Sequence, residues 1–477
     1  MPDRARPTAV VIGASAAGLF AATALAESAD VTVIERDILP DGPEPRRGVP
    51  QARHAHLVWS GGVAAFDALL PGLVGDVVGK GGRLVHIMGD MVSRAPNEIW
   101  FRRFTSTHHR NLVCSRDLLD FVLRERVLSQ PEMTVRQETT VLALEGTASR
   151  VTGVRIRDAG CERTLRADLV IDATGRGSRA PRWLEELGLP PVTERQVDAG
   201  VAYATRLYRA PGTTAALDFP LVNVQANPAK APGRGGIVLP VEGNRWIVTL
   251  SGTRGGEPTA DPDAFLDFAL GLGDPVIGDL LRAAEPLGDV AATRSTANVR
   301  RYYEKLRVWP EGFTVLGDAV AGYNPVYGHG LTVAAQGALA VRDVLRARPL
   351  TAPGTARRLQ RAASRPVAAA WDLAVGQDAF YPGATGTPPT ALERFLARYV
   401  DRAVATGASH PRALGALLDV MSMEKRATRL FSPDMLIPML FGPRRPHLAE
   451  PPITEAERTA ARPADGAAPP QARTRGV

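Results

Sequence analysis

The first residues that suggest chemistry are three small ones between two apolar segments. Gly13, Ser15 and Gly18 follow the β-branched segment 10–12, and a second apolar segment ends at Glu35. Glycine at the first position permits a tight turn, and Gly18 lets a helix pack against a strand. The free N–H groups at such a helix start bind phosphate, and a carboxylate 17 residues after Gly18 can accept hydrogen bonds from ribose hydroxyls. The spacing predicts a dinucleotide-binding βαβ unit, although Ser15 replaces the usual second glycine.

Two further glycine-rich turns follow apolar segments that are typical of buried strands. One covers residues 172–178, and the other begins at Gly317 and Asp318 and continues through residues 324–330 into an expected helix. Open α/β sheets bind ligands at the carboxyl ends of their strands. We therefore expect Asp318 to accept hydrogen bonds from ligand hydroxyls, and Gly328 and Gly330 to let a flat ring approach the backbone.

An arginine begins the helix that we expect from residue 116 to about Ser129. Ser115 is a plausible N-cap, and Arg116 lies in the first turn, where a cation opposes the helix dipole. A phosphate contact would explain this placement, and a solvated arginine is the alternative.

The histidines are weaker candidates for a site. His54 and His56 share one face of an extended strand, but no carboxylate or cysteine joins them at ligand spacing, so we expect no metal. Two interpretations remain for their loop: structural hydrogen bonds, or the lining of a cofactor. A lone histidine such as His329 is more often structural than catalytic.

Composition excludes several classes of protein. The net charge is +7, but only four of the 57 basic residues are lysines, and no basic run is interleaved with aromatics, so nucleic-acid binding is not expected. Residues 9–26 carry no charge, yet glycine, serine and threonine interrupt them, so we expect neither a signal peptide nor a stable membrane span. Cys114 and Cys161 are the only cysteines, which fits a reducing cytoplasm and leaves one disulfide open.

The order of segments predicts an α/β fold with a Rossmann-type domain, an inserted β-sheet domain and C-terminal helices. The expected parts are a discontinuous nucleotide domain at 1–75, 111–185 and 286–348, a substrate sheet at 76–110 and 186–285, a helical region at 349–448, and a disordered tail at 449–477.

Together, the three glycine-rich pieces resemble the FAD-dependent monooxygenases, the group that contains aromatic hydroxylases and squalene epoxidase. Residues 47–56, 246–256 and 324–330 are more closely similar to bacterial polyether epoxidases of the lasalocid and monensin type. The similarity covers most of the chain up to about residue 350 and is looser through the C-terminal helices.

The resemblance implies a role for each cofactor-binding residue. Glu35 would bind the adenosine ribose beside Arg36, Arg116 the phosphates or ribityl chain, and Asp318 the ribityl or pyrophosphate region. The other implied contacts are Gly13, Ser15, Ala16, Ala17 and Gly18 at the pyrophosphate, Arg47 to Gln51 flanking the isoalloxazine, and Pro325 to Gly330 against it.

The resemblance also implies the reaction. Reduced FAD and O₂ would form a C4a-hydroperoxide that epoxidises alkenes of a linear polyketide polyene, free or carrier-bound, in polyether-type antibiotic biosynthesis. The protein need supply no nucleophile, and the backbone of Gly328, His329 and Gly330 would orient the peroxide. Electrons would come from NAD(P)H, directly or through a separate flavin reductase.

Three other functions are weighed against epoxidation. The nearest is an aromatic hydroxylase on the same scaffold. A non-catalytic nucleotide-domain escort protein would purify colourless and consume no oxygen. A halogenase is disfavoured because no Trp-x-Trp-x-Ile-Pro stretch is present.

Overall fold

The computed structural model describes residues 6–294, 296–443 and 445–462. A five-stranded parallel sheet of order β19-β11-β1-β2-β7 organises the nucleotide-binding half. Its strands are β1 (Thr8–Ile12), β2 (Asp30–Ile34), β7 (Met133–Arg136), β11 (Leu169–Asp172) and β19 (Phe313–Val315). The parallel sheet and its crossover helices confirm the expected α/β class.

Both faces of this sheet are buried, which explains the near-continuous apolar character of its strands. Ala9 and Val11 pack on one face with helices from the same core, whereas Val10 and Ile12 pack on the opposite face. The helices of the first face are α1 (Ala16–Ala26), α2 (Ser60–Leu69), α3 (Leu73–Gly79), α4 (Arg116–Leu128) and α8 (Gly330–Ala347). The second face contacts α5 (Ala180–Glu186), α9 (Thr355–Asp378) and an antiparallel sheet of β8 (Thr139–Thr147), β9 (Arg150–Asp158) and β10 (Cys161–Arg166).

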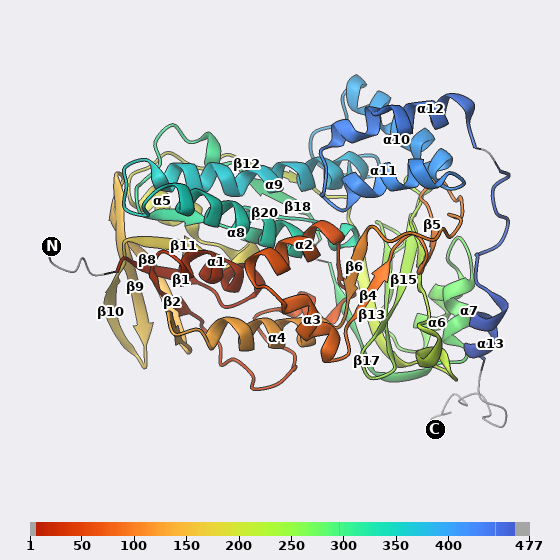
Figure 1. Cartoon of the computed structure of the whole chain (residues 1–477), viewed down its shortest axis with the longest axis horizontal. Helices are drawn as coiled ribbons and strands as arrows, with labels where there is room; N and C mark the ends of the chain where they lie inside the picture. Colours follow the sequence, from red (N-terminus) through yellow and green to blue (C-terminus); the bar gives the residue numbers. More distant parts are fainter. Residues whose placement is uncertain (1–5, 295, 444, 463–477) are drawn as a thin grey trace.

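A six-stranded sheet of order β17-β13-β16-β15-β14-β5 forms the other half of the molecule (Figure 1). Its strands are β5 (Met91–Arg94), β13 (Ala202–Arg209), β14 (Leu221–Val224), β15 (Arg234–Val241), β16 (Arg245–Gly252) and β17 (Glu285–Thr293). Two helices, α6 (Ala264–Leu270) and α7 (Val276–Leu281), share a core with it. The expected domain boundary at residue 286 is wrong, because β17 pairs with β13 as far as Thr293.

Two small sheets join the halves. One has the order β3-β6-β4 and the other β12-β18-β20. Their strands are β3 (Leu57–Val58), β4 (Arg83–His86), β6 (Arg110–Val113), β12 (Glu194–Val197), β18 (Asn298–Arg301) and β20 (Ala321–Gly322). The histidine segment is a loop, as expected: His54 ends a 3₁₀ turn (Pro50–Arg53), and β3 begins only after His56.

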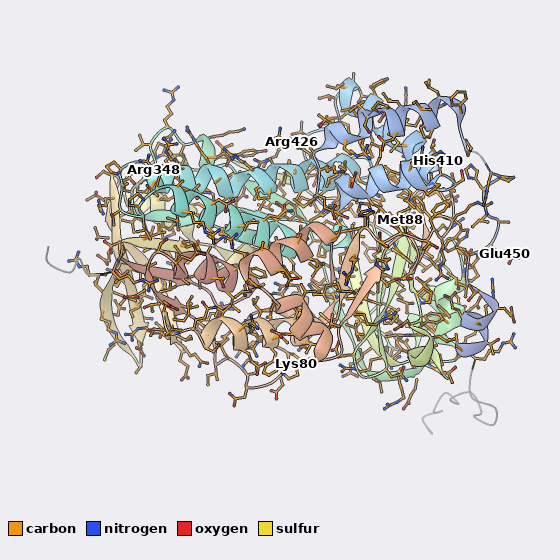
Figure 2. The ribbon with its side chains drawn as sticks, viewed as in Figure 1. Lys80, Met88, Arg348, His410, Arg426 and Glu450 are labelled. Atoms are coloured by element: carbon orange, nitrogen blue, oxygen red, sulfur yellow. The ribbon has the colours of Figure 1, made fainter. Side chains whose placement is uncertain are left out.

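The C-terminal helices α10 (Ala391–Gly407), α11 (Pro411–Met421) and α12 (Pro433–Phe441) lie together above the six-stranded sheet (Figure 1). Leu414 and Leu418 of α11 share a small core with Ile87 and Met88. Met88 marks this junction beneath α11 in Figure 2.

The disordered tail expected from residue 449 is wrong for residues 449–462. Helix α13 (Glu455–Ala460) begins with a capping box formed by Thr454 and Glu457. Arg103 donates to both carboxylate oxygens of Glu457 at 2.8 Å, and Ile453 and Ala461 pack on the sheet core. These contacts order a composition that looks unstructured alone. Residues 463–477 lie outside the described residues.

Among the described helices, none alone has the length and apolar composition to cross a membrane. The pair α2 and α3 passes that test only when taken together, and it is bent by 110°.

Candidate active site

The three glycine-rich turns meet where β1, β11 and β19 end. Gly13 has φ +100°, and a Cβ atom there would lie 2.9 Å from the carbonyl oxygen of Ala173. A Cβ atom on Gly317 would lie 2.7 Å from that of Ala17. Because these strands are parallel neighbours, their carboxyl ends bring together turns that are more than 130 residues apart.

The start of α1 is shaped to approach an anion. A Cβ atom on Gly18 would lie 1.8 Å from the carbonyl oxygen of Gly13, so only glycine lets the helix lie this close to the turn. Ser15 is the N-cap, and its hydroxyl makes no capping hydrogen bond within the described part of the chain. This close packing leaves the backbone N–H groups at the start of α1 accessible to a pyrophosphate.

Glu35 lies at the end of β2 in a buried network of charges. It accepts hydrogen bonds from the amide of Ala14 at 3.0 Å and from the guanidinium of Arg46 at 2.8 Å. Arg46 also lies 3.6 Å from Asp120, which accepts a 2.8 Å hydrogen bond from Arg116. Arg46 and Asp120 were not among the predicted site residues, and neither carries a sequence signal that separates it from neighbouring charged residues.

The predicted Arg47 is exposed, unlike its neighbour Arg46. Arg36 and Gln51 are also exposed at the surface of the same loop region. The structure therefore places these three predicted residues at the rim of the network, while Arg116 lies inside it.

Asp318 lies among the other glycine turns. A Cβ atom on Gly330 would lie 3.7 Å from its Oδ1 atom, and one on Gly175 4.0 Å from its Cβ atom. Burial raises the pKa of Asp318, and the positive charges of Arg176 and Arg116 oppose that rise. Asp318 and Arg176 line a cavity of about 210 Å³. The carboxyl group is thus available to ligand hydroxyls at the point where the turns converge.

A buried network of hydrogen bonds fixes the loop 324–330. Asp378, at the end of α9, accepts hydrogen bonds from Asn298 at 2.6 Å, Asn324 at 2.9 Å and Tyr327 at 2.5 Å. Tyr203 of β13 donates to the Asn324 side chain and accepts from the amide of Val326. These partners come from four distant elements, so no local pattern predicts them.

The first residues of this loop after Asn324 are exposed to solvent. Pro325 is exposed, and Gly328 adopts a left-handed conformation with φ +66°. A Cβ atom on Gly328 would lie 3.3 Å from the indole nitrogen of Trp59, whose N–H donates to the carbonyl of Tyr327. Pro325 and Val326 therefore expose their side chains, whereas Gly328 leaves its backbone without a side chain beside Trp59.

The buried His329 side chain contacts the C-terminal helices. Its Nε2–H donates to the carbonyl oxygen of Met421 at 2.9 Å, and its ring stacks near Trp59 and Tyr327. Burial lowers the pKa of His329 to about 4. The imidazole therefore stays neutral and joins α8 to the C-terminal helices.

His54 and His56, the other two histidines of the sequence analysis, lie where the two halves meet. His54 Nδ1 lies 2.8 Å from the hydroxyl of Thr205, which pairs with Thr249 at 2.7 Å. Burial, with a contribution from the charge of Arg116, lowers the pKa of His56 to about 4. Of the two interpretations open for this loop, these contacts favour structural hydrogen bonds.

A cavity of about 340 Å³ lies between the nucleotide domain and the six-stranded sheet. Leu207, Val241 and Ile247 of the sheet form apolar walls, and Ala52 faces them. Asp117 also lines the cavity, and burial, helped by the charge of Asp120, raises its pKa to about 6. The cavity therefore has an apolar wall on the sheet side, and charged side chains, which include Arg53, Arg245 and Asp289, line the rest of it.

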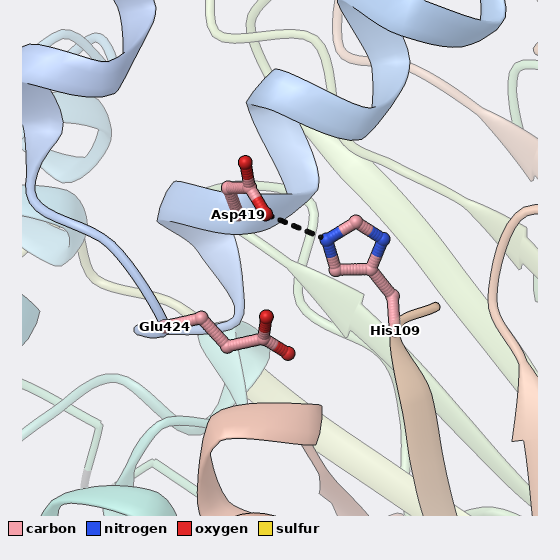
Figure 3. Close-up of side chains that lie close together, drawn as sticks. All are labelled: His109, Asp419 and Glu424. Atoms are coloured by element: carbon pink, nitrogen blue, oxygen red, sulfur yellow. Dashed lines mark hydrogen bonds and ion pairs between the residues drawn. The ribbon is translucent and has the colours of Figure 1, made fainter. Parts of the chain in front are cut away.

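A second group of ionisable side chains, His109, Asp419 and Glu424, lies at the C-terminal end of α11, which carries Asp419 (Figure 3). His109 Nε2 lies 3.1 Å from Asp419, which also accepts hydrogen bonds from Arg429 at 2.7 Å and Lys425 at 3.2 Å. Two cations already neutralise the Asp419 carboxylate. We therefore interpret these side chains as a structural contact between His109 and α11 rather than a cation site.

Comparisons with known proteins agree with this geometry. A family model described as FAD binding domain matches residues 6–375. Protein Rv3254 of Mycobacterium tuberculosis is 34% identical over 424 residues, which cover 82% of this chain and 89% of that protein.

Solved structures share the fold. The flavin-dependent brominase Bmp2 has a TM-score of 0.62 at 14% identity and covers 87% of this chain and 93% of its own. The p-nitrophenol 4-monooxygenase PnpA of Pseudomonas putida has a TM-score of 0.58 at 15% identity, with 92% and 100% covered.

Proposed function

The chain belongs to the FAD binding domain family, a family of flavin-dependent monooxygenases, and on that premise we propose that it epoxidises alkenes of a linear polyketide polyene. The observation that carries the proposal is the apolar wall of Leu207, Val241 and Ile247 in the cavity between the nucleotide domain and the six-stranded sheet. Oxygen transfer to an alkene requires no proton removal from the substrate, so apolar walls suffice to bind it.

The described residues fit FAD. The close contacts at Gly13 and Gly18 leave room only for backbone, and Arg116 supplies a buried positive charge near Asp318. We propose that Gly13 to Gly18 hold the pyrophosphate and Glu35 the ribose. Arg36, Arg47 and Gln51 would contact the cofactor from the exposed rim.

Bound FAD, once reduced, supplies activated oxygen from O₂. The residues of the chain have three tasks: to bind the cofactor, to hold the alkene, and to exclude water. Leu207 and Ile247 would position the alkene. Asp378 fixes the loop 324–330, whose backbone would lie against the flavin ring. One oxygen atom enters the alkene, the other leaves as water, and two electrons come from NAD(P)H.

A second candidate function is hydroxylation of a phenol. Asp117 favours it, because a carboxylate with a pKa of about 6 in the cavity could accept a phenolic proton. The likeness to p-nitrophenol 4-monooxygenase shows a common fold and does not decide between the two substrates.

The experiment supplies the FAD-loaded protein with NADPH, a flavin reductase and ¹⁸O₂, and compares a polyene panel with a phenol panel. We expect a polyene product that gains one ¹⁸O atom as an epoxide, in the Asp117→Asn variant as well. Phenol hydroxylation that Asp117→Asn abolishes would replace the epoxidase proposal. Hydrogen peroxide as the sole product from every substrate would contradict both.

The electron source needs its own measurement. We propose a separate flavin reductase, so NADPH alone should leave the oxidised flavin spectrum unchanged under anaerobic conditions until the reductase is added. Rapid bleaching by NADPH alone would show that the chain accepts hydride directly. A protein that takes up no added FAD would favour the escort function instead.

A further inference from the structure

The outer face of α12 consists of large apolar side chains. Leu436, Ile437, Leu440 and Phe441 are exposed, and the last two have 78% and 84% of their surface accessible. The opposite face is buried through residues that include Met435. A surface helix normally directs polar residues outward, so this arrangement is reversed for a helix surrounded by water.

Helix α10 extends this apolar surface. One face of α10 is buried near the C-terminal end of the helix, at Ala403 and Thr406. Toward the N-terminal end the same face carries Leu392, Phe395 and Val400, and these side chains are exposed.

The two helices are directly joined. Arg402 of α10 donates to the carbonyl of Met439 in α12 at 2.8 Å. Tyr399 of α10 also stacks on Phe431, which lies in the turn before α12, with ring centroids 4.9 Å apart. Figure 1 shows α10 and α12 as outer helices of the C-terminal region. We call the exposed apolar residues of α10 and α12, with Phe431, the outer helical patch.

Basic residues accompany this patch. Residues 391–445 of the sequence contain nine basic and five acidic side chains. Arg398 and Arg426 are exposed, and among the described residues no ion pair involves either of them. Arg426 stands at the surface of the helical region in Figure 2.

We propose that the outer helical patch binds the surface of an anionic lipid bilayer. Interfacial helices combine large apolar side chains that enter the acyl boundary with arginines that meet lipid phosphates. A second copy of the chain fits less well, because a two-fold contact would face each basic rim with the same charges. This proposal does not depend on the reaction proposed above.

The test is flotation of the full-length, FAD-supplied protein with vesicles of phosphatidylcholine alone or with phosphatidylglycerol added. We expect flotation with the anionic vesicles, reduced about tenfold or more in the Leu440→Gln Phe441→Gln variant. The Arg398→Gln Arg426→Gln variant should also lose about tenfold. A matched control, Leu217→Gln Val308→Gln, changes two exposed apolar residues outside the patch and should float like the unchanged protein.

Several results would overturn the proposal. Equal binding to neutral and anionic vesicles would contradict the role of the arginines. An equal loss of vesicle binding in the control variant would show that binding does not depend on the outer helical patch. A protein that does not float but forms a dimer by light scattering, lost in Leu440→Gln Phe441→Gln, would assign the patch to self-association. Circular dichroism of each variant separates lost binding from lost folding.

Discussion

Arg46 is a buried charge whose removal would leave Glu35 without a cation and Asp120 with only Arg116. It neutralises Glu35 at 2.8 Å and lies 3.6 Å from Asp120, and all three side chains are almost wholly buried. We expect Arg46→Ala to lower the free energy of unfolding by about 3–5 kcal/mol, measured by urea denaturation.

The adjacent Arg47 provides a matched control because it is exposed. Arg47→Ala should change the free energy of unfolding by less than about 0.5 kcal/mol. Equal effects of the two substitutions would contradict the buried network.

The buried His329 makes stability depend on pH. Its pKa falls from the ordinary 6.5 to about 4 on burial, so the unfolded chain binds the proton more readily than the folded one. Its contribution to stability is complete above pH 6.5 and is lost as the pH falls toward 4. The difference corresponds to about 3 kcal/mol.

The measurement compares unfolding free energies across this pH range. His329→Gln should flatten the dependence between pH 6.5 and 4, whereas His108→Gln, at an exposed position, should leave it unchanged. An unchanged slope in His329→Gln would show that the ring does not stay neutral on folding.

At the scale of elements, α13 depends on a tertiary contact. Its six residues are too few for a stable isolated helix. Glu457 supports it twice, by accepting from Arg103 and from the amide of Thr454.

We therefore expect Glu457→Ala to release residues 449–462 and to raise their hydrogen exchange by about tenfold or more, as loss of a hydrogen-bonded charge pair costs about 1.5–3 kcal/mol. Glu455→Ala changes an exposed glutamate of the same helix and is the control. Similar exchange in both variants would mean that the Arg103 contact does not hold the helix.

At the scale of the whole molecule, the cavity exists only between the two halves. Leu207 lines it from β13, so Leu207→Trp should fill part of its 340 Å³. We expect turnover of the substrate to fall about tenfold or more, because a small misplacement of a bound substrate is costly. The flavin spectrum should persist.

Val308→Trp is the control, since Val308 is exposed and does not line the cavity. Loss of flavin together with turnover in Leu207→Trp would place the cofactor, rather than the substrate, in this cavity.

The sequence alone determined the parallel-sheet fold, the βαβ unit and the helix that starts after Ser115. These features depend on local patterns: β-branched strands, small residues at turns, and a capping serine. The positions of Gly13 and Asp318 after strand ends also followed, because parallel strands place their carboxyl ends at one edge.

Only the tertiary structure decided which charged and polar side chains are buried. It buried Arg46 and exposed Arg47, joined Asp378 to Asn324, placed His329 against Met421, and ordered residues 449–462. Each choice depends on partners far away in the chain, and burial acts on pKa and pairing through those partners. A sequence pattern specifies the side chain, but its neighbours in space decide its charge and its role.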